Sequence, residues 1–160
     1  FWIGQLGAVG AQINRCPGLP VGRSVVRMAS RITELVINCA DPQLLAAFWS
    51  EVLGYVELGW EGEAVEIGPR GAGFGGLQPT LVFVRSAEPK RGKLSLHFDV
   101  NPTDRDQDAE LERLLAVGAR KADIGQTGAE TWHVLADSEG NEFCRLRRRV
   151  EVLEEGPNAR

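Results

Sequence analysis

The sequence repeats the same order of predicted elements twice, and this internal repeat restricts the fold more than any single motif does. In each copy a strand is followed by a helix and then by three more strands. Alternating polar and apolar residues, β-branched side chains and intervening turn residues predict the eight strands. These strands fall at Arg31–Asn38, Tyr55–Leu58, Ala64–Ile67, Thr80–Val84, Leu94–Val100, Arg120–Ile124, Thr131–Ala136 and Glu142–Leu146.

The predicted helix of each copy begins soon after the first strand. In the first copy Asp41 and the proline after it supply an N-cap and a favourable first helical residue. Apolar residues then form one stripe over Gln43–Leu53, and Gly54 ends the helix. In the second copy Asn101 and its proline repeat the starting signal, and a second apolar stripe extends over residues 109–117.

The repeat predicts an architecture with a cavity. A single helix can cover only one face of a four-stranded sheet, so the other face of each sheet is left open. Two open faces turned toward each other would enclose a space for a ligand. We therefore predict an α+β fold in which two βαβββ modules form a curved mixed sheet around a cavity.

The composition excludes several classes of partner. The chain of 160 residues has 43% hydrophobic residues, enough for one core, and a formal net charge of -4. Nucleic acid is not an expected partner, because phosphate binding requires a basic surface. No run of about eighteen residues is apolar throughout, so no membrane span is predicted. The three cysteines show no paired spacing, which indicates free thiols in a reducing cytoplasm.

Residues 1–27 differ from the rest of the chain. They contain no acidic residue and no lysine, and glycine and proline interrupt their apolar stretches. We predict that they are a non-native or disordered extension and that the native chain starts at Met28. A secretory signal is the competing interpretation, although a basic first segment is missing. The domain itself is predicted at residues 28–150, with a flexible tail at residues 151–160.

Three stretches of the sequence resemble the vicinal oxygen chelate superfamily, which includes glyoxalases, bleomycin-resistance proteins and ring-cleaving dioxygenases. They are ITELVINCADPQLLAAFWSEVLGY at Ile32–Tyr55, LHFDV at Leu96–Val100 with ELERLLAVGA at Glu110–Ala119, and WHVLADSEGNEFCRL at Trp132–Leu146. The last stretch looks most like the uncharacterised glyoxalase-like proteins of bacteria. The resemblance implies a small organic ligand in the cavity and, as in some relatives, a homodimer. It does not define the reaction, because one fold hosts many functions.

Alternation along the strands predicts which side chains face the cavity. On the first strand Glu34 and Asn38 would face it. On the fifth strand Ser95, His97 and Asp99 would face it together. His97 is one of two histidines, and the ordinary pKa of histidine near neutrality suits a metal ligand or a general base.

The resemblance also implies a divalent metal, with iron, manganese, zinc, nickel or magnesium as the ion. The family's ligand on the first strand corresponds to Glu34, and its ligand on the fifth strand corresponds to Ser95 or His97. The family's glutamate on the last strand falls at Cys144, which departs from the oxygen and nitrogen ligands of the family. Glu142 lies two residues earlier with the same orientation. We predict a metal site of Glu34, His97 and Cys144, and Glu34, His97 and Glu142 as the catalytic residues.

Two functions remain open from the sequence. In the first, the metal polarises a substrate, and the chain is a lyase, isomerase or dioxygenase. In the second, no metal is bound, and the chain sequesters a drug-like compound against aromatic walls, as resistance proteins do. The predicted ligand-binding residues are Asn38, Trp60, Phe83, Ser95, Asp99 and Trp132. The glycine-rich stretch Gly68–Gly76 lacks the context of a phosphate-binding loop, so we predict a flexible lip over the pocket.

Overall fold

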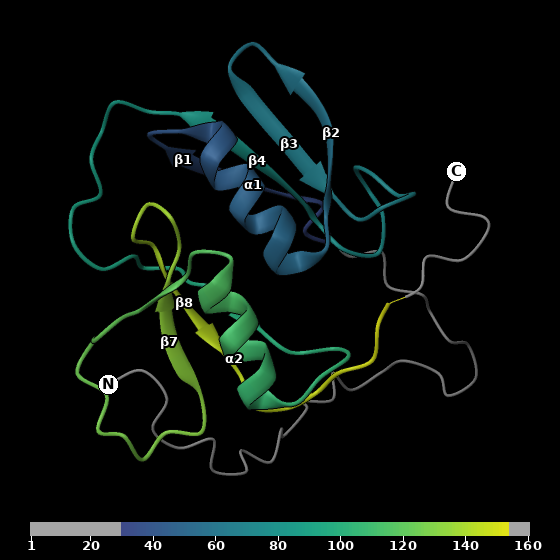
Figure 1. Ribbon diagram of the computed structural model, residues 1–160. Helices are drawn as coiled ribbons and strands as arrows, with labels where there is room; N and C mark the ends of the chain where they lie inside the picture. The colour runs from purple at the N-terminus through teal and green to yellow at the C-terminus, as the bar shows by residue number, and fades with distance from the viewer. Residues whose placement is uncertain (1–29, 154–160) are drawn as a thin grey trace, which may run out of the picture. The chain divides into compact units, whose positions relative to one another are not determined.

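The elements follow in the predicted order, and the computed structural model describes them within residues 30–153 (Figure 1). The first half of the domain consists of β1 (Glu34–Cys39), α1 (Pro42–Leu53), β2 (Val56–Glu61), β3 (Ala64–Gly68) and β4 (Thr80–Arg85). The second half consists of β5 (Asp99–Val100), α2 (Gln107–Ala116), β6 (Arg120–Lys121), β7 (His133–Ala136) and β8 (Glu142–Arg145). All of these elements belong to one compact unit that starts at Arg31. The predicted extension over residues 1–27 and most of the predicted tail lie outside the described residues.

Each half forms one mixed four-stranded sheet, which confirms the predicted α+β fold with two βαβββ modules. The strand orders are β1-β4-β3-β2 and β5-β8-β7-β6. In each sheet the first and last strands of the half pair in parallel, and the other neighbouring strands pair antiparallel. Within the described part of the chain, no strand ladder joins the two sheets. In these strand orders β1 and β5 are each an edge strand of their own sheet.

Helix α1 forms because of local signals at both of its ends. Asp41 Oδ1 accepts a hydrogen bond from the Leu44 N–H (3.1 Å), and Pro42 occupies the first turn. Gly54 ends the helix in the left-handed region, with a φ of 69°, where glycine is favoured. The buried face of α1 packs on β3 and β4. Within residues 30–153, no helix is long and apolar enough to cross a membrane.

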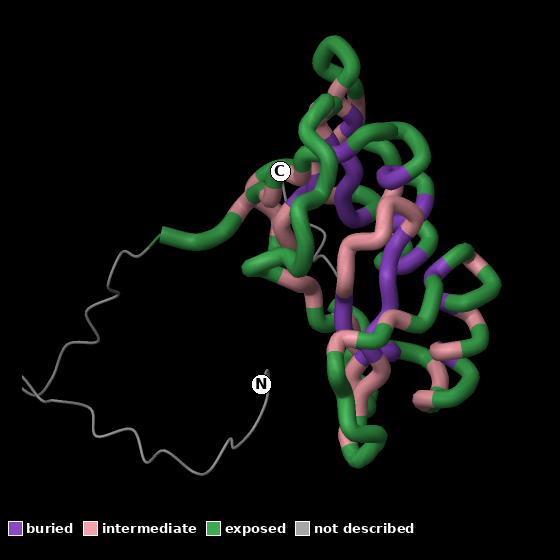
Figure 2. Tube along the Cα trace, turned by 90° about the vertical axis from the view of Figure 1, so that its left-hand side faces the viewer, coloured by how far each residue is buried: buried purple, intermediate pink, exposed green. Residues whose placement is uncertain are grey.

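One hydrophobic core extends through both halves. Leu45 and Phe83 are fully buried in the first half, and Phe143 is buried in the second. Trp49 of α1 connects them, because its ring lies 5.0 Å from the Phe98 ring and 5.2 Å from the Phe143 ring between centroids. Buried residues follow the interior of both halves, and the loops are mostly exposed (Figure 2).

The second half also supplies hydrogen bonds to both ends of α1. At its start, the two carboxylate oxygens of Glu139 accept hydrogen bonds from the N–H groups of Asp41 (2.7 Å) and Ala40 (2.9 Å). At its end, the Arg113 guanidinium donates to two backbone carbonyls of the last turn, at 2.8 and 3.0 Å. Asp41 is the N-cap and Ala40 precedes it, so Glu139 binds the backbone where the chain enters α1. Arg113 binds carbonyls that the helix cannot satisfy by itself, and each charge has the sign that the helix dipole favours.

The fifth strand is much shorter than predicted. Leu94–Val100 was expected to be a strand, but only its last two residues pair with β8, with Asp99 opposite Cys144. Continuing this parallel register backwards would place Leu94–Leu96 opposite residues 139–141, which belong to the turn before β8. No strand backbone is therefore in place for these residues to bond to.

Helix α2 begins later than the sequence signal at Asn101 indicates. Its N-cap is Asp106, whose side chain accepts a hydrogen bond from the Ala109 N–H at 2.9 Å. The Asn101 side chain instead donates to the Arg148 carbonyl oxygen at 2.7 Å. Asn101 therefore binds the chain segment that follows β8, and Asp106 is the residue that caps α2.

The thiol of Cys39, at the end of β1, provides a test of this core. Burial raises its pKa from 9.0 to about 11, the charge of Glu139 adds to the effect and the charge of Arg85 opposes it. At about pH 8 the thiolate fraction should therefore be about 100-fold lower in the folded protein than in the unfolded chain. We expect iodoacetamide to alkylate Cys39 more slowly by at least this factor, as measured by peptide mass spectrometry. Equal rates in folded and urea-unfolded protein would contradict the burial of this thiol.

Candidate functional site

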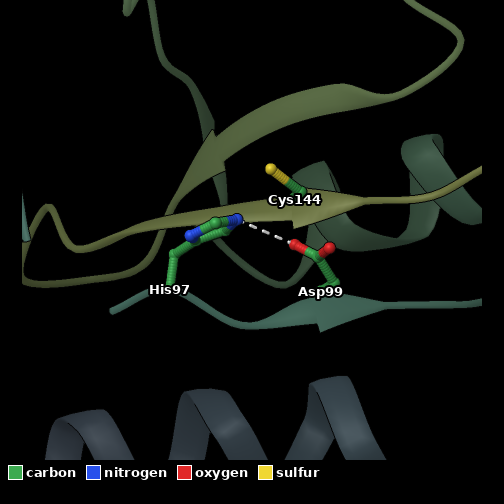
Figure 3. Close-up of side chains that lie close together, drawn as sticks. All are labelled: His97, Asp99 and Cys144. Atoms are coloured by element: carbon green, nitrogen blue, oxygen red, sulfur yellow. Dashed lines mark ion pairs between the residues drawn. The ribbon is translucent and has the colours of Figure 1, made fainter. Parts of the chain in front are cut away.

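Three potential ligand side chains meet on the open face of the second sheet. Asp99 pairs with Cys144 in the parallel register of β5 and β8, so the two side chains share a face. His97 lies two residues before Asp99 and points the same way (Figure 3). His97 Nε2 lies 3.0 Å from Asp99 Oδ1, and one ligand atom from each of the three residues lies within 4.8 Å of the others.

The three groups differ in their exposure. The Cys144 thiol is buried, and burial raises its pKa to about 11, with further contributions from the charge of Asp99 and a hydrogen bond with it. The Asp99 carboxylate is exposed over 38% of its side chain, and the His97 ring over 22%. A ligand from solvent can therefore reach the nitrogen and oxygen donors while the sulfur stays shielded.

A pocket of about 380 Å³ lies next to this cluster. It is lined by part of β1, by Trp49 of α1, by residues 94–98 and by the turn that leads into β8. Most of its wall is apolar, and it includes Trp49. His97 belongs both to the pocket and to the cluster, and this makes the two features one candidate site. The lining residues are Val36, Ile37, Asn38, Trp49, Leu94, Ser95, Leu96, His97, Phe98, Asp137, Asn141 and Glu142.

Among the sequence-predicted residues, Asn38, Ser95 and Glu142 also line this pocket. The Glu142 carboxylate forms an ion pair with Lys90, with Nζ 2.7 Å from Oε2. Burial alone would raise the pKa of Glu142, but the hydrogen bond from Lys90, hydrogen bonds from backbone N–H groups and the charge of Lys90 together outweigh it, so the pKa lies below its ordinary value. Glu34 is exposed on β1 and belongs neither to the pocket lining nor to the cluster.

The predicted aromatic walls lie elsewhere. Phe83 is fully buried in the core, because alternation along β4 turns it toward α1. Trp60 pairs with Val65, whose side chain is buried in the core, so Trp60 lies on the helix-covered side at the sheet edge. Trp132 is half-buried outside the pocket lining. The pocket lining instead includes Trp49, which the sequence pattern assigned to a helix stripe, and Phe98.

The sequence pattern also missed Asp137 as a pocket residue. Its carboxylate accepts hydrogen bonds from the N–H groups of Glu139 (3.0 Å) and Asn141 (2.9 Å), which is the local signature of an aspartate that forms a turn. It also accepts from Trp49 Nε1 at 3.2 Å and from Asn141 Nδ2 at 3.0 Å. Both Asp137 and Asn141 line the pocket, so this turn fixes one wall of the site.

The donor set fits a borderline transition metal better than a hard ion. An imidazole nitrogen, a carboxylate oxygen and a thiolate sulfur are the ligands that zinc and iron accept, whereas magnesium requires oxygen ligands. Three protein donors also leave coordination positions for water or substrate, as catalytic zinc sites do. His97, Asp99 and Cys144 could therefore hold such an ion.

Comparison with known proteins places the chain in a family. The family of the glyoxalase-like domain matches residues 34–146, which is well over half of the chain, so the protein belongs to the glyoxalase-like family. This result confirms the resemblance seen in the sequence. A search of curated proteins finds no match.

Solved structures show the same fold at low sequence identity. The fosfomycin resistance protein FosX from Listeria monocytogenes, solved in complex with Mn(II) and 1S,2S-dihydroxypropylphosphonic acid, is 15% identical, with a TM-score of 0.56 over 79% of this chain and 94% of its own. A possible glyoxalase from Bacillus cereus is 17% identical, with a TM-score of 0.54 over 74% and 99% of the two chains. A glyoxalase/bleomycin resistance protein/dioxygenase family enzyme from Burkholderia phytofirmans is 19% identical, with a TM-score of 0.53 over 72% and 97%. At these identities the likeness shows the fold alone. The cytoplasmic location and the homodimer stay predictions.

Proposed function

We propose that the protein binds a transition-metal ion through His97, Asp99 and Cys144 and acts on a small organic molecule held in the adjoining pocket. The observation that carries this proposal is the convergence of the three ligand atoms within 4.8 Å of one another beside a pocket of about 380 Å³. The reaction class is that of a lyase, isomerase or dioxygenase. The Mn(II) ion in the FosX structure supports a metal in this fold.

The proposed metal site differs from the one expected from sequence. Asp99 replaces Glu34 as the carboxylate ligand, so all three donors come from the second half of the domain. A bound ion would supply Lewis acidity toward an oxygen of the substrate. His97 would place the ion beside the pocket, because His97 is the proposed ligand that also lines the pocket. The apolar wall with Trp49 would exclude water from the bound molecule.

Cobalt titration of the metal-free protein tests the proposal. We expect one Co²⁺ ion per chain and a thiolate-to-cobalt charge-transfer absorption, because a cysteine ligand binds as the thiolate. Cys144→Ser should abolish that absorption. Cys39→Ser is the matched control, since Cys39 is an equally buried thiol outside the cluster, and it should leave the absorption unchanged. Stoichiometric binding without the absorption, or no binding at all, would refute the proposed ligand set.

A metal-free binding protein is the second candidate. The observation that favours it is the mainly apolar lining of the pocket, to which Val36, Leu94 and Leu96 contribute. Such a wall can hold an apolar compound without any catalytic group. The protein would then sequester a drug-like compound, and the cobalt titration would show no specific binding.

A further inference from the structure

We infer that the ligand of this pocket carries a protonated amine, which binds Glu142 in exchange for the Lys90 side chain. The inference rests on the proposed function in one respect, namely that the pocket holds a small organic molecule. It does not depend on the metal. It concerns the chemical class of the ligand, which neither the fold nor the cluster defines.

The chain already holds an ammonium group at this place. Lys90 Nζ lies 2.7 Å from Glu142 Oε2 and donates a hydrogen bond of 2.6 Å to the carbonyl oxygen of Gly140. One charged and one neutral acceptor therefore converge on a single nitrogen position. This is the arrangement that a primary ammonium group requires, because such a group has three donors and no acceptor.

The ion pair lies between two cavities. Glu142 lines the pocket described above, and Lys90 lines a second cavity of about 540 Å³ beside the start of α1. The two cavities share Asn38, Leu94 and Asn141, so they adjoin. An ammonium group on a molecule in the first pocket can thus reach the Glu142 carboxylate from the pocket side.

Lys90 can leave this position when another ammonium group takes it over. It belongs to the connector over residues 86–98, which has no regular secondary structure, and its side chain is already 24% exposed. A ligand ammonium would make the same two contacts that Lys90 gives up. The pair is largely buried, with side-chain exposures of 24% for Lys90 and 19% for Glu142, so Glu142 would be costly to leave unpaired. The exchange is therefore driven by the ligand ammonium that replaces Lys90 and by burial of the ligand's apolar part.

The charges of the pocket also select against an anion. Among the described residues, its lining includes the carboxylates of Asp137 and Glu142 and neither lysine nor arginine, and once Lys90 has left, the charge of Glu142 is no longer balanced. Asp137 is almost fully buried, and its oxygens are already occupied by hydrogen bonds from Trp49 and the surrounding turn. A carboxylate or phosphonate in the pocket would lie near these two acids, whereas a cation would be attracted by them.

The experiment compares benzylamine, benzyl alcohol and benzoate, which have the same aromatic body and differ in charge. Their binding to the full-length, metal-free protein is measured at neutral pH by NMR titration. We expect benzylamine to bind most tightly and benzoate least. Lys90→Ala should strengthen benzylamine binding by about 5-fold, because the competing ammonium is removed. Arg91→Ala is the matched control: it removes the same charge from the same exposed connector and should have little effect.

Glu142→Gln removes the negative charge of the proposed acceptor and keeps the size and shape of the side chain. We expect this variant to bind benzylamine and benzyl alcohol equally. Tighter binding of benzoate than of benzylamine, or weaker binding of benzylamine in Lys90→Ala, would overturn the inference and leave the pocket in place. If none of the three probes shifts pocket resonances, the ligand pocket itself is refuted, and the inference falls with it. The cobalt titration still decides the metal site independently.

Discussion

Replacing Trp49 with alanine is expected to lower the free energy of unfolding by about 3–5 kcal/mol, near the upper limit for a single core substitution. The side chain is 2% exposed, and its ring contacts those of Phe48, Phe98 and Phe143 edge-on. Its Nε1–H also donates to Asp137 Oδ2 at 3.2 Å. Truncation would leave a cavity where the cores of the two halves meet and take one donor from a buried carboxylate.

Urea unfolding followed by far-UV circular dichroism measures this effect, and Trp60→Ala is the matched control. Trp60 is 48% exposed at the sheet edge, and its Nε1–H bonds to Glu57 in an exposed position. Its removal should cost less than about 1 kcal/mol. Similar losses for the two tryptophans would mean that Trp49 does not connect the halves as described.

Removal of the His97 imidazole should weaken cobalt binding by about 100-fold or more. Even partners that only orient a metal ligand contribute about 10–100-fold to affinity, so a direct ligand should contribute at least the upper value. His133→Ala should leave the affinity unchanged. His133 pairs with Arg145 on the helix-covered side of the second sheet, away from Cys144, and burial together with the charge of Arg145 lowers its pKa.

Competition against a coloured chelator at neutral pH measures the two dissociation constants. Cobalt affinity that is retained in His97→Ala would show that the ion binds elsewhere. Equal loss in both variants would point to a general effect on folding, and circular dichroism of each variant separates that case from ligand loss. Asp99→Asn provides the corresponding test for the oxygen donor.

The fold was predictable because its signals are local and repeated. Alternation along β1 and the Asp41 cap of α1 depend only on neighbouring residues, and both occur where the sequence indicates. The second half was less predictable, because the length of β5 depends on the turn before β8. The start of α2 depends on the Asn101 side chain, which is taken up by the Arg148 backbone. These are contacts between distant segments that periodicity does not reveal.

The candidate site was predictable to the extent that it follows strand alternation. Period-two alternation predicted that His97 and Asp99 share a face, and the structure brings Cys144 to them. The positions of the predicted aromatic residues depend on the pairing register of whole strands. A shift between Glu57 and Gly59 in the β2–β3 pairing decides the side on which Trp60 falls. The distance of Glu34 from the cluster depends on how the two sheets pack, which no local pattern encodes.

Helix α1 belongs to the first copy of the repeat by sequence, but both of its ends depend on the second copy. Glu139 accepts from the N–H groups of the N-cap and of the residue before it, and Arg113 donates to the last carbonyls of the helix. A fragment that ended inside the connector would expose these groups to water and strip Trp49 of two aromatic neighbours. The repeat in sequence is therefore not a repeat of two self-sufficient structural units, because the helix of the first copy depends on side chains of the second at both of its ends.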